Sequence, residues 1–150
     1  MTTRITLKRF GWWSSASVLL IMLTHTAGAV PLQLQCPAQY PNRQQWSNLH
    51  AAGWQKILAG DERGSLGEAG LMLGPPTDNA VLRGVDLPQS EGRAFHFSGT
   101  EQDLDRWIYC DYGTGKFSRL AYQLPVHIKR CESKEKMVRG RGRGAYFRCD

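Results

Sequence analysis

Hydrophobic and polar residues alternate with a period of two along much of the second half of this chain. The alternation, or an enrichment in β-branched and aromatic residues, recurs in short segments that glycine and proline separate. This arrangement is typical of antiparallel strands joined by tight turns. It predicts a mainly β fold, an antiparallel sheet, sandwich or small barrel with at most a short helix. The predicted strands are 93–97, 106–112, 117–124, 126–131 and 145–149.

The second of these strands carries large side chains on both faces. Ile108, Cys110 and Tyr112 share one face, which we assign to the core. Trp107 and Tyr109 share the opposite face, where aromatic rings could hold a sugar ring or anchor a protein partner. Burial is the usual role of such residues. Both readings stay open, and we keep the pair as candidate binding residues.

The first half of the chain has a weaker pattern. The apolar residues within 46–58 fit either a helix flawed at Gly53 or two short strands that break there, and we predict the strands. The polar segment 60–70 is predicted as a loop, 71–73 as a short strand and 82–88 as irregular. The fold prediction therefore rests mainly on the second half.

The N-terminus has the layout of a secretory signal. Three basic residues, Arg4, Lys8 and Arg9, precede a mostly apolar run at 10–23, and small residues follow it in an Ala-Gly-Ala sequence that ends at Ala29. This order predicts a cleavable signal peptide, a helix outside the fold. An uncleaved membrane helix is the alternative, which the run disfavours because it is shorter than a spanning helix requires.

Cleavage after Ala29 defines a signal peptide of residues 1–29 and a single domain of residues 30–150, a length typical of one domain. The chain holds 19 basic and 13 acidic residues, and three of the basic residues lie in the leader. The predicted mature domain therefore has 16 basic against 13 acidic residues, a net charge of +3. About half of the chain's net charge of +6 belongs to the export signal.

All four cysteines, Cys36, Cys110, Cys131 and Cys149, lie in the predicted mature domain. An even count in an exported chain predicts two disulfides, and the absence of tight Cys-x-x-Cys pairs argues against a metal site. Four cysteines allow three pairings. The glycine-rich stretch 138–144 predicts a hairpin that would place Cys131 opposite Cys149 within bridging range. That pairing leaves Cys36 with Cys110, and no metal or cofactor is expected.

The same hairpin concentrates positive charge. Eight basic residues lie between positions 129 and 148, with only Glu132 and Glu135 against them. Arginine side chains match carboxylate and phosphate groups, so the patch suits an anionic partner, a protein or an envelope polymer. A solvated, solubilising hairpin tip is the alternative. Export argues against nucleic acid as the partner. The candidate binding residues here are Arg139, Arg141 and Arg143.

Catalytic residues do not form a recognisable set. A hydrolase needs a nucleophile, a base and an orienting group together, yet the chain has no Gly-x-Ser-x-Gly motif. His96 lies between two phenylalanines of one strand face and is expected to point to solvent. Asp103 and Asp105 could form a carboxylate pair, but a solvated turn is the more ordinary role. We therefore predict a protein that is not an enzyme.

Several short motifs, in order, resemble a family of small exported proteobacterial proteins of unknown function, named after a hypothetical Salmonella gene product. They are Cys-Pro at 36–37, Gly-Trp at 53–54, Gly-Pro-Pro at 74–76, Trp-x-x-Cys-x-Tyr at 107–112, Leu-Pro at 124–125 and two late cysteines. The resemblance implies a periplasmic setting and supplies no catalytic residues. A shorter segment, 109–113, is similar to a strand and turn of periplasmic lysozyme inhibitors.

Together these features predict a non-enzymatic binding or accessory protein of the periplasm, or one secreted further. In its most concrete form it would be an inhibitor of, or immunity factor against, a cell-wall hydrolase. The alternative is a protein that binds anionic peptidoglycan or lipopolysaccharide through the basic hairpin. A hydrolase with an unrecognised site is a third possibility. Contact with the membrane is expected only through the signal peptide before cleavage.

Overall fold

The computed structural model describes residues 30–60, 64–88, 92–99, 103–114, 117–139 and 142–150. Within them the chain forms one helix and nine strands. In chain order these are β1 (Leu32–Cys36), α1 (Arg43–Ala51), β2 (Trp54–Leu58), β3 (Leu66–Leu73), β4 (Val85–Asp86), β5 (Gly92–His96), β6 (Arg106–Tyr112), β7 (Ser118–Gln123), β8 (Arg130–Val138) and β9 (Gly142–Cys149).

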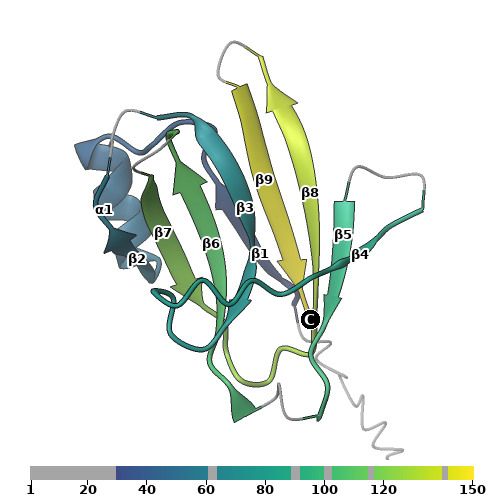
Figure 1. The fold of residues 1–150 in the computed structure, drawn as a ribbon. Helices are drawn as coiled ribbons and strands as arrows, with labels where there is room; N and C mark the ends of the chain where they lie inside the picture. Colours follow the sequence, from purple (N-terminus) through teal and green to yellow (C-terminus); the bar gives the residue numbers. More distant parts are fainter. Residues whose placement is uncertain (1–29, 61–63, 89–91, 100–102, 115–116, 140–141) are drawn as a thin grey trace, which may run out of the picture.

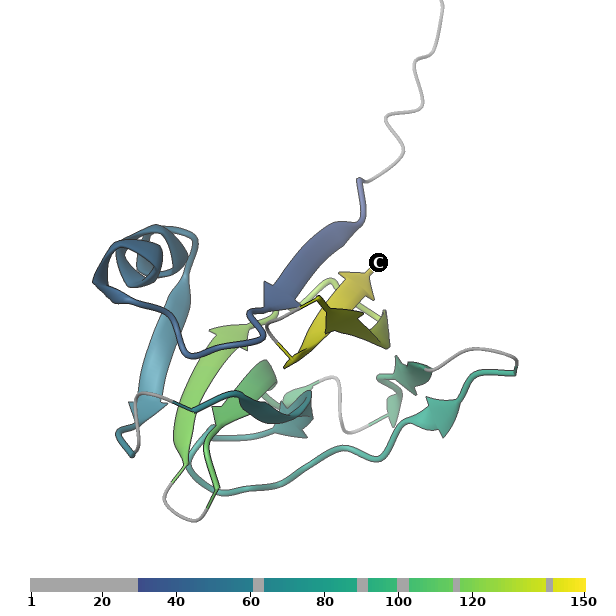
Figure 2. The same ribbon diagram turned by 90° about the horizontal axis from the view of Figure 1, so that it is seen from above.

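The strands form two antiparallel sheets. The first has the order β1-β9-β8-β5-β4, and the second has the order β2-β7-β6-β3. The long hairpin of β8 and β9 stands next to β3 (Figure 1). Seen from above, the sheets lie as separate layers, with α1 beside β2 (Figure 2). The prediction of a mainly β fold is confirmed, in its sandwich form.

The main core lies between the two sheets. From β6 it receives Ile108, Cys110 and Tyr112, all fully buried, as the alternation predicted. Phe95 and Phe97 lie in the same core, while the residue between them, a histidine, is exposed. The period-two pattern therefore identified the inner face of these strands.

The opposite face of the four-stranded sheet also buries side chains. Met72, Trp107, Tyr109 and Ala121 form a second buried cluster there. All seven residues of β6 are buried as a result. This second cluster explains why β6 carries large side chains on both of its faces.

Two disulfides join the four cysteines as predicted. Cys131 and Cys149 are register partners on β8 and β9, with their Cα atoms 4.1 Å apart. Cys36 and Cys110 have Cα atoms 5.7 Å apart, and their disulfide links β1 of the first sheet to β6 of the second. One bridge therefore closes a hairpin, and the other ties the two layers together.

The prediction of two short strands within 46–58 is wrong for its first part, which belongs to α1. Asn42 caps this helix: its side chain accepts a hydrogen bond from the Gln45 amide at 2.9 Å, and the Gln45 side chain accepts one from the Asn42 amide at 3.0 Å. Gly53, at φ +96°, then allows the turn into β2. No residue of α1 is fully buried, and only Trp46 and Leu49 pack partly buried against the core, so the apolar signal for this helix is short.

The predicted strand 126–131 is also too long, because β8 begins only at Arg130. The residues before it form a turn, in which the carbonyl oxygens of Val126 and Ile128 accept hydrogen bonds from the guanidinium of Arg106, both at 2.6 Å. Arg106 is 2% exposed, so a buried charge holds this turn in place. These bonds join residues 20 and 22 positions apart, which periodicity does not detect.

The segment 60–70, predicted as a loop, contains the first half of β3. Its glycines are typical of a loop, yet Gly70 belongs to a strand. A Cβ atom at this position would lie 3.0 Å from the Tyr109 ring. The missing side chain lets the ring pack directly on β3. Within the segment 82–88, predicted as irregular, the two residues of β4 pair with β5.

No helix in the described part of the chain is long and apolar enough to cross a membrane. The predicted signal peptide, residues 1–29, lies outside the described residues and stays a prediction. β1 begins at Leu32. Cleavage after Ala29 would therefore leave every paired residue of β1 in place.

Candidate partner-binding cleft

A cleft of about 490 Å³ opens between β3 and the β8–β9 hairpin, and we refer to it as the β3 cleft. One wall is the four consecutive residues 67–70 of β3. The opposite wall includes Ser133 and Glu135 of β8 with Arg143 and Ala145 of β9. The cleft therefore exists because the hairpin lies beside the edge of the second sheet.

Tyr109 and Glu68 lie on the β3 side of the cleft. The Tyr109 hydroxyl donates a hydrogen bond to the Glu68 carboxylate at 2.9 Å. Burial raises the pKa of this hydroxyl above its usual value, and the hydrogen bond to Glu68 raises it further. The tyrosine is therefore a neutral donor that fixes the position of the carboxylate.

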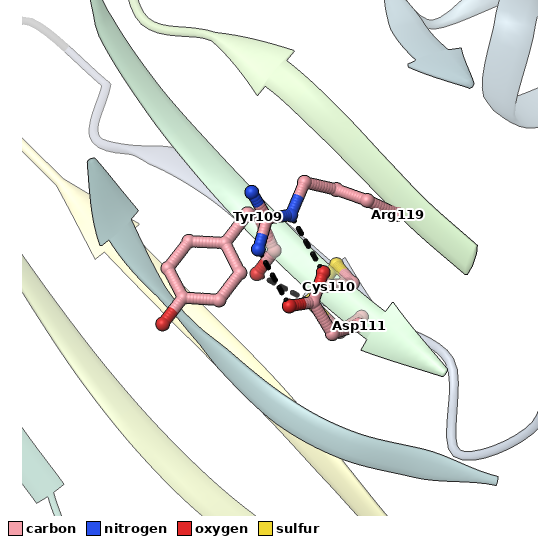
Figure 3. The surroundings of a disulfide bond; sticks show 5 residues. Tyr109, Cys110, Asp111 and Arg119 are labelled. Atoms are coloured by element: carbon pink, nitrogen blue, oxygen red, sulfur yellow. Dashed lines mark hydrogen bonds and ion pairs between the residues drawn. A yellow bond between two sulfur atoms is a disulfide. The ribbon is translucent and has the colours of Figure 1, made fainter. Parts of the chain in front are cut away.

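Arg119 anchors the neighbouring part of this face (Figure 3). Its Nε and Nη2 atoms each donate to a carboxylate oxygen of Asp111 at 2.7 Å. Its Nη1 atom donates to the Pro76 carbonyl at 3.1 Å and to the Asn79 side chain. The guanidinium also lies 5.0 Å from the centre of the Tyr109 ring, a cation–π contact. These bonds fasten the chain that follows β3 to the sheet.

The charges around Tyr109 do not cancel. Asp111 and Arg119 form a buried pair, and the hydrogen bonds to Asp111 raise the pKa of the arginine. Glu68 forms no ion pair with any residue that the structure describes. On the other walls, Glu135 pairs with Arg143 at 3.0 Å, and that pair is half exposed. The β3 side of the cleft thus carries one uncompensated negative charge.

A second cleft of about 400 Å³ adjoins the first. It shares Glu68, Val81 and Tyr109 with the β3 cleft and extends to Phe117 and Arg119. Val81 is 47% exposed, a large apolar residue at the junction of the two clefts. The two hollows therefore form one continuous surface around the first half of β3.

The structure brings together two of the five residues predicted to bind a partner. Tyr109, which is 1% exposed, and Arg143 line the same cleft. Trp107 is 7% exposed and belongs to the second buried cluster. Arg139 is exposed in the turn after β8, and Arg141 lies outside the described residues. The roles of these five residues in binding stay predictions.

Two glutamates reduce the positive charge of the hairpin. Glu132 pairs with Arg130, and Glu135 pairs with Arg143. Lys134 is exposed, as are Lys136 and Arg139, and none of these three forms an ion pair with a described carboxylate. Arg148, near the base of the hairpin, is also exposed without a described ion pair, so the unpaired cations are spread along the hairpin rather than gathered at its tip.

Sequence reasoning missed Glu68 and the edge on which it lies. The signal was present in the spacing of Gly67 and Gly70, because isolated glycines in a strand mark a close approach to the backbone. The sequence prediction instead assigns them to a loop. Without the sheet order, nothing in the sequence placed the hairpin opposite them.

The carboxylates considered as a catalytic pair lie on the surface. Asp103 and Asp105 are exposed in the turn before β6, where Asp105 accepts a hydrogen bond from Gln123 at 3.0 Å. No three histidine, cysteine, aspartate or glutamate residues in the described ranges lie close enough together to hold a metal ion.

The fold and the cleft define a small, doubly disulfide-bonded β sandwich with an open surface suited to a macromolecular partner. Residues 61–150 match the family model described as Type VI secretion system Tli immunity protein, and the chain belongs to this family. Neither the curated proteins nor the solved structures include a match to the chain.

The family supports a role as an immunity protein, which acts by binding a secreted effector protein. This agrees with the immunity factor predicted from the sequence. The match does not name the family called after the Salmonella product, so that resemblance stays a prediction. The matched region includes every residue that lines the β3 cleft, whereas β1, α1 and β2 lie before it.

Proposed function

We propose that this protein neutralises a toxic effector of a type VI secretion system by binding it through the β3 cleft and the adjoining hairpin. The observation that carries the proposal is the family match over residues 61–150, which contain the whole cleft. In the finer form of the proposal, the effector is a hydrolase that attacks the cell wall.

The periplasm is the compartment that fits this role. Two disulfides persist only where the environment is oxidising. The signal peptide predicted at residues 1–29 would deliver the chain there. An effector that attacks the cell wall also acts in this compartment, so inhibitor and target would meet.

Charge on the hairpin would guide the encounter. Arg143 lines the cleft, while the exposed Lys134 and Lys136 alternate along β8 with the cleft-lining Ser133 and Glu135 and so lie on the opposite face of the hairpin. A cluster of one sign accelerates association with a surface of the opposite sign and has less effect at high salt. We therefore expect the effector to present an acidic surface to the hairpin.

The test is capture of the effector followed by an inhibition assay. Tagged protein from the periplasm is used to isolate partners from the secreted fraction of the producing strain, and each partner is assayed on purified peptidoglycan and on phospholipid. A stoichiometric partner whose peptidoglycan hydrolysis is inhibited supports the full proposal. Inhibition of phospholipid hydrolysis instead would keep the immunity role and overturn the cell-wall target.

Charge reversal tests the hairpin. The double variant R139E/R143E should weaken capture of the effector by about tenfold at low salt, since each rim charge mainly affects association. Arg43→Glu on α1 is the matched control for each single variant, R139E or R143E, because the same charge change then lies at the other edge of the second sheet and should leave capture unchanged (Figure 1). Retention of the protein on peptidoglycan or lipopolysaccharide alone would favour the polymer-binding alternative.

A further inference from the structure

β3 is an edge strand, and the outer side of its first half has no strand beside it. β6 pairs with β3 on one side. On the other side, the Leu66 amide donates to the Ala38 carbonyl at 2.9 Å, and the Leu71 carbonyl accepts from the Leu82 amide at 2.8 Å. Between these two contacts, the described chain offers no backbone partner to residues 67–70.

Ala69 holds the free donor and acceptor in this gap. The Leu71 carbonyl faces away from β6, and the backbone groups of alternate residues face the same side of a strand, so those of Ala69 face away from β6 as well. Gly67 and Glu68 are exposed and Ala69 is half-buried. Unpaired backbone groups on an open edge are a template for another strand.

The cleft leaves room for such a strand. All four residues from 67 to 70 line it, and the small side chain of Ala145 lies in the opposite wall. A strand added to an edge lies roughly 4.7 to 4.9 Å from its neighbour. The volume of about 490 Å³ suits a few residues of extended chain rather than a folded element.

Glu68 determines which charge an added strand can carry opposite it. A residue directly opposite it on an added strand would have its side chain on the same face, with Cβ atoms roughly 4.5 to 5.5 Å apart. Glu68 forms no ion pair with a described residue, because the nearby Arg119 is bound to Asp111, and the Glu68 carboxylate is held in position by Tyr109. A basic side chain opposite Glu68 would be stabilised there, and an acidic one would be repelled.

We propose that β3 receives an extended segment of the effector as an added strand at residues 67–70, with a lysine or arginine of that segment opposite Glu68. The identity of the partner rests on the proposed function, and the edge specifies how the partner is recognised. Backbone hydrogen bonds provide affinity, and the alternate side chains provide specificity.

A model peptide tests the edge without the effector. The blocked pentapeptide Thr-Val-Lys-Val-Thr is titrated into ¹⁵N-labelled protein purified from the periplasm and followed by NMR. We expect a saturable shift of the Ala69 amide, which N-methylation of the peptide backbone abolishes. Glutamate in place of the peptide's lysine should weaken binding by about threefold or more. An Ala69 amide that does not respond to the lysine peptide would overturn the proposal.

Matched variants separate charge from fold. Glu68→Gln keeps an acceptor for Tyr109 but removes the charge, so it should erase the preference for the lysine peptide. Glu135→Gln, on the opposite wall, should keep that preference. If Glu68→Gln binds the two peptides with the unmodified protein's preference, Glu68 does not select the partner and the charge assignment fails.

Hydrogen exchange then examines the complex with the captured effector. The Ala69 amide should exchange about tenfold more slowly in the complex, while the Gly70 amide, which faces β6, is protected with or without it. Binding without protection of Ala69 would overturn the added strand and leave the proposed function standing. If no effector is captured, the proposed function fails. The peptide titration alone then decides whether the β3 edge accepts an added strand. Protection of Ala69 that grows with protein concentration would instead assign the edge to a second copy.

Discussion

Two tyrosines on opposite faces of β6 differ in how their hydroxyl groups are satisfied. Tyr109 donates to Glu68, whereas the buried hydroxyl of Tyr112 has no hydrogen-bond partner among the described residues. A buried polar group without a partner loses its hydration and gains nothing in return. The two side chains therefore form a natural pair for comparison.

Removing each hydroxyl should have opposite consequences. Tyr109→Phe should lower the free energy of unfolding by about 1 kcal/mol, because a buried hydrogen bond is lost. Tyr112→Phe should leave this free energy unchanged or raise it, since no bond is lost. Urea denaturation at neutral pH measures both. A Tyr112 variant as unstable as the Tyr109 variant would show that its hydroxyl has a partner after all.

Stability should also fall in alkali. Burial raises the pKa of both hydroxyls, so the folded protein keeps these protons at a pH where the unfolded chain, with values near 10, has released them. Their contribution is complete below about pH 10 and is lost as the pH rises further. Denaturation between pH 8 and pH 11 should show this loss. The double variant Y109F/Y112F should lose less, and an identical slope would contradict the assignment.

At the scale of elements, the two disulfides should differ in their contribution. Their sequence separations are 74 and 18 residues, and closing a longer loop removes more entropy from the unfolded chain. The loop model gives about 4.5 kcal/mol for Cys36–Cys110 and about 3 kcal/mol for Cys131–Cys149. Paired cysteine-to-alanine variants, compared by thermal unfolding, should follow this order. The reverse order would mean that strain or residual structure outweighs loop length.

Helices and strands were predictable from the sequence where the local pattern of residues indicated which of them are buried or paired. β6 was found because both of its faces are buried, and the β8–β9 pairing followed from glycines between two cysteines. α1 was missed because its signal is a polar capping pair, Asn42 and Gln45, rather than an apolar stripe. The first half of β3 was missed because its Gly70 makes room for the Tyr109 ring of β6, a contact that the local sequence does not reveal.

The candidate site was less predictable for a reason that concerns the whole molecule. The β3 cleft combines 67–70 with residues of β8 and β9 that follow them by more than 60 positions. Sheet order brings these parts together, and no local pattern reports sheet order. Tyr109 and Arg143 were named as binding candidates for separate reasons, and the fold placed them on one cleft.

The disulfide pattern also bears on how the chain would mature when exported through the predicted signal peptide. In chain order, the bridges join the first cysteine to the second and the third to the fourth. A chain that crosses the membrane N-terminus first presents Cys36 and Cys110 to the periplasm before Cys131 arrives. Oxidation in order of arrival therefore produces the native pairs directly. The protein can reach its final form without a step that reshuffles wrongly paired cysteines, a benefit for a defence that must be ready before the toxin arrives.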